Sequence, residues 1–392
     1  MNIGVDQDTF AQIHRAVQRF TQERLIPAER RVEEEDDVPA DIVAEMRELG
    51  LFGISIPEEY GGLGLNLSQE VALMIEVGHA SLAFRSVFGT NVGIGSQGIV
   101  MDGTEEQKRT WLPRLASGEA TASFALTEPE AGSDAGSLRT RARRDGDHFI
   151  IDGTKRYITN ATRATIFALM ARTDPDQRGA SGISAFIVPS DTPGISIGPY
   201  DKKMGQRGTR TCDVIFENVR IPASAMIGGP ALLNQGFKTA MKVLDRGRIH
   251  IAALALGTAD RLIQEACRYA LDRKQFGKPI ADFQLVQAML ADSQTEYYAG
   301  LTMIRDAASR FDAGMSITQE AACAKYFCTE AVGRIADRAV QIFGGAGYMA
   351  EYPIERIYRD VRLLRIYEGT SQIQQLIIAK NMLKQHAAGR EG

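Results

Sequence analysis

The sequence predicts an α+β fold built in three consecutive parts. Apolar residues recur at helical spacing in residues 1–120, which predicts an all-α N-terminal domain. Short β-prone runs separated by Pro, Gly and Asp turns fill residues 121–232 and predict a small antiparallel β domain. The helical period returns in residues 233–392, which predicts a helical bundle. Because a chain of 392 residues exceeds one ordinary core, its length also favours two or three domains.

The first third of the chain carries helix patterns and helix-start signals. Residues 8–30 place five apolar side chains on one helical stripe: Phe10, Ile13, Val17, Phe20 and Leu25. Ser68 is suited to cap a helix over residues 69–79, because a serine side chain can accept from the free backbone N–H groups of the first turn. Thr104 and Gln107 have the spacing of a capping box at the start of another helix.

The middle of the chain changes to strand patterns. The run HFII, the dipeptide Asp152-Gly153 and the run TKRYIT predict a β-hairpin, because Asp-Gly is a strong two-residue turn signal. Further short strands are expected over residues 165–173, 182–190, 195–200 and 212–222.

The last third returns to helices and ends in a segment with unusual chemistry. A long helix is expected over residues 239–276, with Ala and Leu frequent on one side. Residues 331–343 are apolar at helical spacing, so the glycine cluster that follows ends a helix; the cluster is not GxGxxG and no β-branched strand precedes it. Further on, the carboxylate Glu368 stands alone before Gly369, which invites a catalytic interpretation.

Charge and cysteine content exclude several classes of function. The formal net charge of −4 leaves no basic footprint for nucleic acid. The four cysteines lack metal-ligand spacing and the five histidines are scattered, so neither a zinc site nor a disulfide framework is expected and a reducing cytoplasm fits. No secretory signal and no run of 18 apolar residues are present, so no membrane span is expected.

Four motifs, in this order along the chain, resemble the acyl-CoA dehydrogenase family of flavoproteins. They are ALTEPEAGSDAGSLRT (125–140), DRGR (245–248), RKQFG (273–277) and the stretch 341–374, which contains IYEGTSQIQ. The resemblance covers essentially the whole chain. It implies three domains ending in a four-helix bundle, an FAD cofactor, a homotetramer that is a dimer of dimers, and electron-transfer flavoprotein as the electron acceptor in fatty acid or amino acid catabolism.

The resemblance implies that one surface of the β domain holds the flavin ring. An isoalloxazine ring needs N–H and hydroxyl donors along its polar edge and an aromatic side chain against its face. The simpler interpretation of the motif is an ordinary Gly/Ser/Asp loop. The residues implied as flavin contacts are Phe124, Leu126, Thr127, Ser133, Tyr157 and Thr159.

A second set of residues resembles contacts to the adenosine and pyrophosphate of a neighbouring subunit's FAD. An arginine fork suits phosphate oxygens, although Arg273 taken alone could simply oppose a helix dipole. This set comprises Arg273, Gln275, Phe276, Gln284, Gln341, Gly344, Gly345, Thr370 and Gln372.

Glu368 resembles the family's catalytic base, which removes the α-proton of the thioester. A glutamate with an ordinary pKa is a weak base, so burial by substrate and flavin is expected to raise its pKa. The simpler interpretation is a solvated acid at a helix N-terminus. Some members carry the base on the long helix at the position of Gly247, and glycine cannot act there.

Substrate contacts follow from the same resemblance. Asp245, Arg248, Gly369 and Ser133 resemble the residues that hold the CoA arm and the substrate mouth, although Asp245 and Arg248 could be only a surface i, i+3 ion pair. Arg85-Ser86 resembles glutaryl-CoA dehydrogenases, in which the arginine faces a free carboxylate on the acyl tail. Arg85 could instead pack its stem and leave its head in water, or pair with a local glutamate.

Three functions remain open at this stage. The first is α,β-desaturation of an acyl-CoA by an FAD-dependent acyl-CoA dehydrogenase. The second is a glutaryl-CoA-type dehydrogenase and decarboxylase, or another enzyme for an acidic acyl-CoA. The third is a flavoprotein scaffold without turnover.

Overall fold

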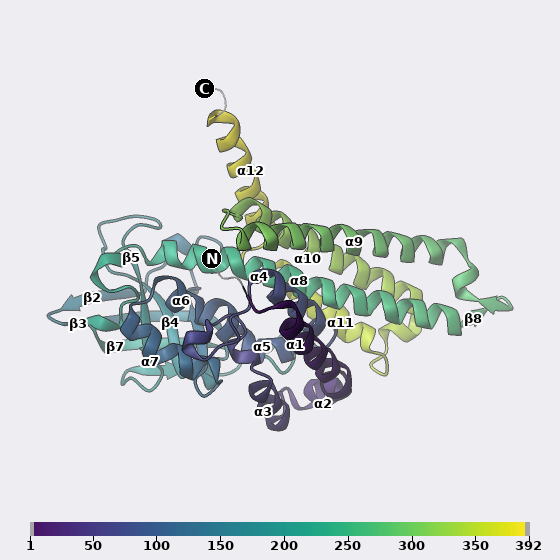
Figure 1. Ribbon diagram of the computed structural model, residues 1–392, viewed down its shortest axis with the longest axis horizontal. Coiled ribbons are helices and arrows are strands. Elements are labelled where there is room, and N and C mark those ends of the chain that lie inside the picture. Colours follow the sequence, from purple (N-terminus) through teal and green to yellow (C-terminus); the bar gives the residue numbers. More distant parts are fainter. Residues whose placement is uncertain (1–3, 389–392) are drawn as a thin grey trace.

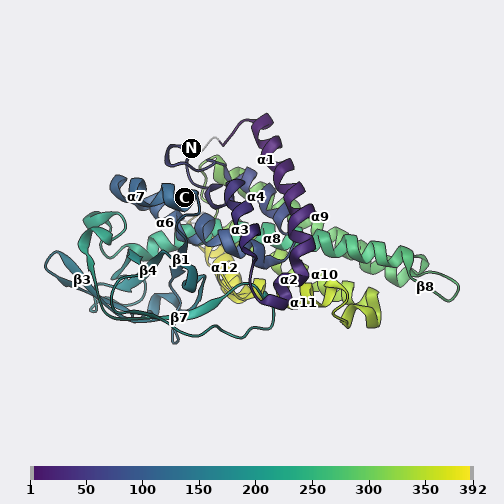
Figure 2. The same cartoon turned by 90° about the horizontal axis from the view of Figure 1, so that it is seen from below.

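The structure, a computed structural model, describes residues 4–388 of the chain. A β-sheet with short helices beside it lies at one end, and three long helices extend away from it to the opposite end (Figure 1). A view from below shows the same separation between the sheet and the tip of the long helices at β8 (Figure 2). The predicted α+β fold class and its helical, β and helical order are confirmed. No helix within residues 4–388 is long and apolar enough to cross a membrane.

The N-terminal region is helical. Short π-helical turns over Thr21–Leu25 and Thr90–Gly95 join some of its α-helices. The α-helices are α1 (Gln7–Phe20), α2 (Ile26–Glu35), α3 (Ala40–Glu48), α4 (Leu67–Val77), α5 (Leu82–Gly89), α6 (Gln97–Asp102) and α7 (Glu105–Ala116).

The predicted helix start is confirmed at α7 and is wrong at α4. The Thr104–Gln107 capping box is present, with Gln107 N donating to Thr104 Oγ1 at 3.3 Å and Thr104 N donating to Gln107 Oε1 at 3.0 Å. Helix α4 begins earlier than expected, because Asn66 rather than Ser68 is its N-cap. The Ser68 hydroxyl instead donates to Asp312 at 2.6 Å and ties α4 to a distant helix.

The sheet has the strand order β1-β4-β2-β3-β7-β6, with β5 paired to the free side of β4. Most pairs are antiparallel as predicted, but β1 and β2 each run parallel to β4. The sheet has an apolar core of its own, which contains two edge-to-face pairs of phenylalanine rings, Phe149 with Phe186 and Phe167 with Phe216. The strands are β1 (Ala122–Ala125), β2 (Arg141–Asp145), β3 (His148–Thr159), β4 (Ile166–Arg172), β5 (Ile183–Pro189), β6 (Ile195–Ile197) and β7 (Thr211–Pro222).

The predicted hairpin turn at Asp152-Gly153 is wrong. Strand β3 runs through this dipeptide without turning, and the turn lies at Gly146-Asp147, between β2 and β3. The pairing of β3 with β7 shifts register between Ile151 and Gly153, where Glu217 and Asn218 of β7 lie opposite Asp152 alone, so the dipeptide faces a bulge in β7. A Cβ at Gly153 would lie 2.7 Å from Thr140 Cα, which explains the glycine by a close approach of backbone rather than by a turn.

The C-terminal region is built on α8 (Gly236–Asp272), α9 (Gln284–Asp312) and α10 (Thr318–Phe343), which pack side by side. Helix α8 ends four residues before the predicted end, and the short strands β8 (Lys274–Gln275) and β9 (Lys278–Pro279) form a ribbon at its tip. Helices α11 (Pro353–Val361) and α12 (Ser371–Ala388) follow; α12 packs on α10 and then projects from the body (Figure 1).

Helix α8 connects the regions. Its start contacts the sheet beside β5, and its middle crosses α4 at very short range. A Cβ at Gly257 would clash with the carbonyl of Ile75, and Thr258 Oγ1 donates to Gly78 O at 2.9 Å across the same crossing. One apolar core therefore joins the N-terminal and C-terminal helices, and it positions them as one wall against the sheet.

Candidate active site

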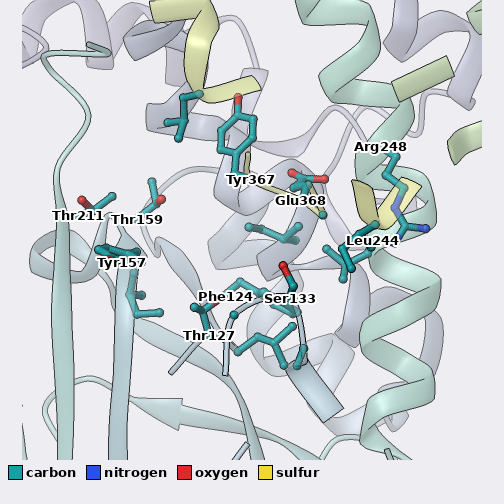
Figure 3. A pocket seen from close by; sticks show the side chains of 18 of the residues that line it. Phe124, Thr127, Ser133, Tyr157, Thr159, Thr211, Leu244, Arg248, Tyr367 and Glu368 are labelled. Atoms are coloured by element: carbon teal, nitrogen blue, oxygen red, sulfur yellow. The ribbon is translucent and has the colours of Figure 1, made fainter. Parts of the chain in front are cut away.

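A cavity of about 580 Å³ lies where the three regions meet. Helix α5 contributes Arg85, the sheet side contributes Phe124 and Ser133, and the C-terminal region contributes Arg248 and Glu368. Figure 3 shows Glu368 between Tyr367 and Arg248, across the cavity from Ser133 and Phe124. The cavity thus brings together residues that are up to 292 positions apart, from Arg85 to Ile377.

All six residues predicted to contact the flavin ring line this cavity. The hydroxyls of Thr127, Ser133 and Thr159 have no hydrogen-bond partner within residues 4–388. Tyr157 is 62% exposed and has φ of +57°, a left-handed conformation that is uncommon for a bulky residue. Phe124 and Tyr157 supply aromatic surface, so this wall offers free hydroxyls beside apolar faces.

A buried ion pair fixes the backbone of this wall. Lys155 is completely buried, and its Nζ donates to Leu126 O at 3.0 Å and to Glu128 Oε1 at 2.8 Å. The Glu128 carboxylate also accepts from Arg139 N at 2.6 Å and Thr140 N at 2.9 Å. Burial lowers the pKa of Lys155 to about 8 although Glu128 opposes it. Burial alone would raise the pKa of Glu128, but the charge and hydrogen bond of Lys155 lower it.

Glu368 lies in a sharp turn before α12. Its φ is +52° and that of Gly369 is +88°, so two successive residues are left-handed. The Oε2 atom of Glu368 is buried and has no hydrogen-bond partner among the described residues. A Cβ at Gly247 would clash with this oxygen, so the glycine of α8 makes room for the carboxylate.

The electrostatic surroundings of Glu368 act in opposite directions. Burial raises the pKa of the carboxyl group, because an ionised form loses hydration. Arg85, Lys325 and Arg248 oppose this by favouring the anion, but the net direction is upward. A glutamate with a raised pKa and a free oxygen is suited to accept a proton from a ligand in the cavity.

Arg248 and Asp245 form an ion pair of 2.5 Å, but not at the surface. Arg248 is buried, lines the cavity and has an Nε without a partner in residues 4–388. Burial lowers the pKa of Arg248. Asp245 does not line the cavity; its other oxygen accepts from Thr318 Oγ1 at 2.7 Å, so it holds Arg248 from behind. The simple surface ion pair is therefore wrong for these two residues.

Arg85 is also buried, with 8% of its surface exposed, and lines the cavity. Its Nε has no partner within the described chain. A Cβ at Gly89 would lie 2.6 Å from this nitrogen, so the glycine makes room for the guanidinium group. The predicted alternative, an arginine with its head in water, is therefore wrong. A buried guanidinium nitrogen without an acceptor is costly unless a ligand pairs with it.

The residues predicted to contact adenosine and pyrophosphate do not line the cavity. Arg273, Gln275 and Phe276 lie at the tip of α8, and 25 helical residues from Arg248 to Arg273 span about 37 Å. Gln284 begins α9 near the same tip. The exposed residues Gln341, Gly344 and Gly345 end α10 at this end of the bundle, where Phe343 stacks on Tyr269 of α8 with centroids 4.1 Å apart.

Thr370 and Gln372 lie at the base of α12. Thr370 Oγ1 accepts from Ile373 N at 3.3 Å and so caps the helix. Gln372 is exposed. Neither lines the cavity in this chain, whereas Gly369 does.

Several cavity residues lie outside the motifs that the sequence shows, or beside them. Gln206 comes from the irregular loop between β6 and β7, where no pattern indicates a site. Leu244 and Tyr367 neighbour the recognised Asp245 and Glu368, so their positions within the motifs could have indicated them. Lys325 and Gln374 do not line the cavity but contact the Gly369 carbonyl behind Glu368.

Three family models match nearly the whole chain. They are the acyl-CoA dehydrogenase N-terminal domain over residues 7–119, the middle domain over residues 123–219 and the C-terminal domain over residues 234–383. The protein is therefore a flavin-dependent oxidoreductase. It belongs to the acyl-CoA dehydrogenase family.

Relatives agree with this assignment. The 3-(aryl)acrylate reductase of Clostridium sporogenes is 43% identical over 95% of this chain and 98% of its own length. The probable acyl-CoA dehydrogenase YngJ of Bacillus subtilis is 44% identical over 95% of this chain and 97% of its own.

Solved structures share the whole fold. Butyryl-CoA dehydrogenase from Megasphaera elsdenii superposes with a TM-score of 0.92 at 33% identity, covering 98% of this chain and all of the other. A glutaryl-CoA dehydrogenase in complex with glutaryl-CoA superposes with a TM-score of 0.91 at 32% identity, covering 98% of this chain and 97% of the other. The three-domain architecture inferred from the four motifs is confirmed.

Proposed function

We propose that this protein is an FAD-dependent acyl-CoA dehydrogenase that converts an acyl-CoA thioester to the trans-2-enoyl-CoA. The observation that carries the proposal is the buried Oε2 of Glu368, which has no partner in residues 4–388 and lies across the cavity from a wall of free hydroxyl groups. A carboxylate oxygen held in this way can take a proton from a carbon atom of a bound ligand.

The wall on the sheet side fits a flavin. Phe124 and Tyr157 offer apolar faces to a planar ring, and the free hydroxyls of Thr127, Ser133 and Thr159 offer donors to its polar edge. The Lys155–Glu128 pair keeps the backbone carrying Thr127 fixed, so these donors need little rearrangement. When bound, FAD supplies the acceptor for the hydrogen that leaves the β-carbon with its electron pair.

Glu368 takes the proton from the α-carbon, and the electron pair left behind forms the new carbon–carbon double bond as the β-hydrogen leaves. The raised pKa makes Glu368 a stronger base than an ordinary glutamate. Arg248, held by Asp245, together with Ser133 and Gly369, contacts the thioester arm at the mouth of the cavity.

Assembly completes the cofactor site in this proposal. Arg273, at the tip of α8, lies about 37 Å along the helix from Arg248. The end of α10 contacts α8 at Tyr269, about 32 Å along the helix from Arg248, and both places are too far to contact the FAD in the cavity of their own chain. They contact the adenosine half of FAD in a second subunit of a homotetramer. Exposed apolar side chains at this tip, including Phe276 at 93% and Tyr348 at 83%, support a surface that a partner covers. Electron-transfer flavoprotein is the proposed acceptor.

The test is anaerobic bleaching of the yellow protein by straight, branched and dicarboxylic acyl-CoAs. Glu368→Gln should retain flavin yet lose reduction by about 10³-fold or more. Flavin reduction at the normal rate by this variant would contradict the role of Glu368, and a wild-type protein that no thioester bleaches would support a scaffold. Because one relative is a reductase, the flavin should also be reduced chemically and mixed with enoyl-CoAs, which measures the reverse direction.

A second candidate is an acidic acyl-CoA substrate, and Arg85 favours it. The buried, unpartnered Nε of this residue in the cavity suits a terminal carboxylate on the acyl tail. Arg85→Gln should then reduce kcat/KM for glutaryl-CoA by about 100-fold while changing that for butyryl-CoA less than threefold. Wild-type protein that oxidises butyryl-CoA well and ignores glutaryl-CoA would contradict this candidate. Carbon dioxide among the products distinguishes decarboxylation from simple oxidation.

A further inference from the structure

Behind Glu368, a second buried lysine contacts the turn that carries the carboxylate. Lys325 of α10 has no exposed surface, and its Nζ donates to Gly369 O at 2.7 Å. Gln374 of α12 donates its Nε2 to the same carbonyl at 3.0 Å and to Glu368 O at 3.2 Å. One side chain from each of two helices therefore holds the two successive left-handed residues of the turn.

The turn depends on such support because its conformation is unfavourable by itself. A left-handed φ at a non-glycine residue costs of order 1–3 kcal/mol and persists only where neighbouring groups fix it. Thr370 Oγ1 caps the helix that follows, but it does not contact the Glu368 peptide. Lys325 and Gln374 supply the contacts that aim Glu368 into the cavity.

The two supports differ in charge. Gln374 is neutral, whereas the ammonium group of Lys325 has no carboxylate partner within hydrogen-bond distance among the described residues. Burial lowers the pKa of Lys325 to about 8, against the attraction of Glu368 and with the repulsion of Arg248. Near neutral pH the lysine is thus charged, and the anion it favours is Glu368.

We propose that Lys325 is a positioning residue for the reaction, which holds the Glu368–Gly369 turn by its hydrogen bond and stabilises the ionised base by its charge. The inference rests on the proposed function of Glu368 as base. The other charged groups around it are Arg85 from α5, Arg248 from α8 and Glu330 from α10, with Asp134 and Lys203 lining the cavity from the sheet side.

The experiment compares Lys325→Gln with Gln374→Met in the flavin-loaded protein. Lys325→Gln can keep a donor but removes the charge, so the pKa of Glu368 should rise further. The acid limb of the anaerobic flavin-reduction rate should move up by about one pH unit, which is about tenfold slower at pH 6, while the high-pH plateau stays within about threefold. Gln374→Met should lower the rate by a similar factor at every pH without moving the limb. Lys384→Gln, exposed on α12, controls for net charge.

An unmoved acid limb in Lys325→Gln, or an equal loss at every pH, would overturn the proposal and leave Lys325 as a structural residue. If Lys325→Gln does not fold, Lys325→Arg replaces it, and the proposal requires its acid limb to stay within about 0.3 pH units of the wild type. A larger movement overturns it.

A second measurement separates this inference from the proposed function, because it requires no turnover. The folded pKa of Glu368 lies above its unfolded value, so ionisation destabilises the fold as pH rises between the two values. Glu368→Gln should therefore stabilise the protein increasingly over that interval, and the gain should level off at the folded pKa. When Glu368→Gln is made in the Lys325→Gln variant, the stability gain should level off about one pH unit higher. If it levels off at the same pH as before, the inference is contradicted, even if no acyl-CoA reduces the flavin.

Discussion

Two completely buried lysines lie on opposite sides of the cavity, and they differ in what they contact. Lys155, on the sheet side, binds the carboxylate of Glu128, whose oxygens also accept two backbone N–H groups. Lys325, on the helical side, binds a carbonyl and faces a carboxylate that has a free oxygen. Burial lowers the pKa of both lysines to about 8.

The two sides of the cavity differ in how their buried charges are paired. We call the sheet side, with Lys155 and Glu128, the structural wall, and the helical side, with Arg85, Arg248 and Glu368, the reactive wall. On the sheet side the buried charges satisfy one another, which keeps a surface rigid. On the helical side, buried polar atoms of Arg85, Arg248 and Glu368 lack partners within residues 4–388. Unsatisfied buried polar groups cost stability, so the presence of three such charged side chains at one cavity indicates that a ligand completes them.

The largest effect is expected when the Lys155–Glu128 ion pair is broken. Lys155→Met leaves the Glu128 carboxylate buried and unpaired, which should lower the free energy of unfolding by about 3–5 kcal/mol. Lys325→Met should lower it by only about 1–2 kcal/mol, because it leaves a carbonyl that Gln374 still contacts. Chemical denaturation measures both. The double variant Lys155→Met/Glu128→Gln should regain part of the loss, because glutamine removes the buried charge and keeps an oxygen that can accept from Arg139 N or Thr140 N. Equal losses in the two lysine variants would contradict the comparison.

A smaller effect is expected at the reactive wall, on activity rather than stability. In Gly247→Ala, the new methyl group collides with Glu368 Oε2 and displaces the base. The rate of flavin reduction should fall about 10–100-fold. Gly98→Ala on α6 is the matched control, because its Cβ would meet Thr239 Cγ2 at an ordinary 3.5 Å. Equal rates in the two variants would show that the carboxylate does not need the space beside α8.

The smallest expected effect concerns two histidines, His79 and His250. Both ring nitrogens of His79 have hydrogen-bond partners, whereas one ring nitrogen of His250 has none among the described residues. His79 contacts Asp260 at 2.7 Å and Glu76 O at 3.1 Å. Burial lowers its pKa, but the hydrogen bond to Asp260 and the nearby acids outweigh this and raise it overall. The His79–Asp260 pair should therefore add about 1 kcal/mol to the free energy of unfolding. This contribution is fully present below about pH 6.5 and is lost as the pH rises through the higher pKa of His79 in the folded protein. In His79→Gln this pH dependence of the unfolding free energy should disappear.

His250 is the comparison for that measurement. It is buried against Glu70, and its Nδ1 has no partner in the described chain. Burial lowers its pKa, so it should not contribute to stability in the same direction. A dependence that persists unchanged in His79→Gln would assign it to another group.

The sequence predicted the elements whose cause is local. Helical periodicity and the Thr104–Gln107 box depend on neighbours three or four positions away, and both predictions were correct. The turn predicted at Asp152-Gly153 is wrong because tertiary contacts outweigh the turn preference of this dipeptide. Asp152 accepts from Asn218 N at 2.7 Å, and the backbone of Gly153 lies against Thr140. Distant pairing decided that conformation, and no local pattern contains it.

The site divides in the same way. Glu368, Arg248 and the six residues predicted from the motifs to contact a flavin ring all line the cavity. Lys325 could not be identified, because a lysine on an Ala-rich helix ordinarily extends into water. Its complete burial follows from the packing of α10 against α8 and α12, which involves residues distant in the sequence.

The length of α8 has a consequence for measurements of cofactor affinity. In the proposed assembly the cavity and the tip of α8 serve different copies of FAD, so cofactor binding and subunit association are thermodynamically linked. Dilution should then release FAD even when nothing competes for the site, and added FAD should favour association to the same extent. An affinity measured at one protein concentration would describe that concentration alone.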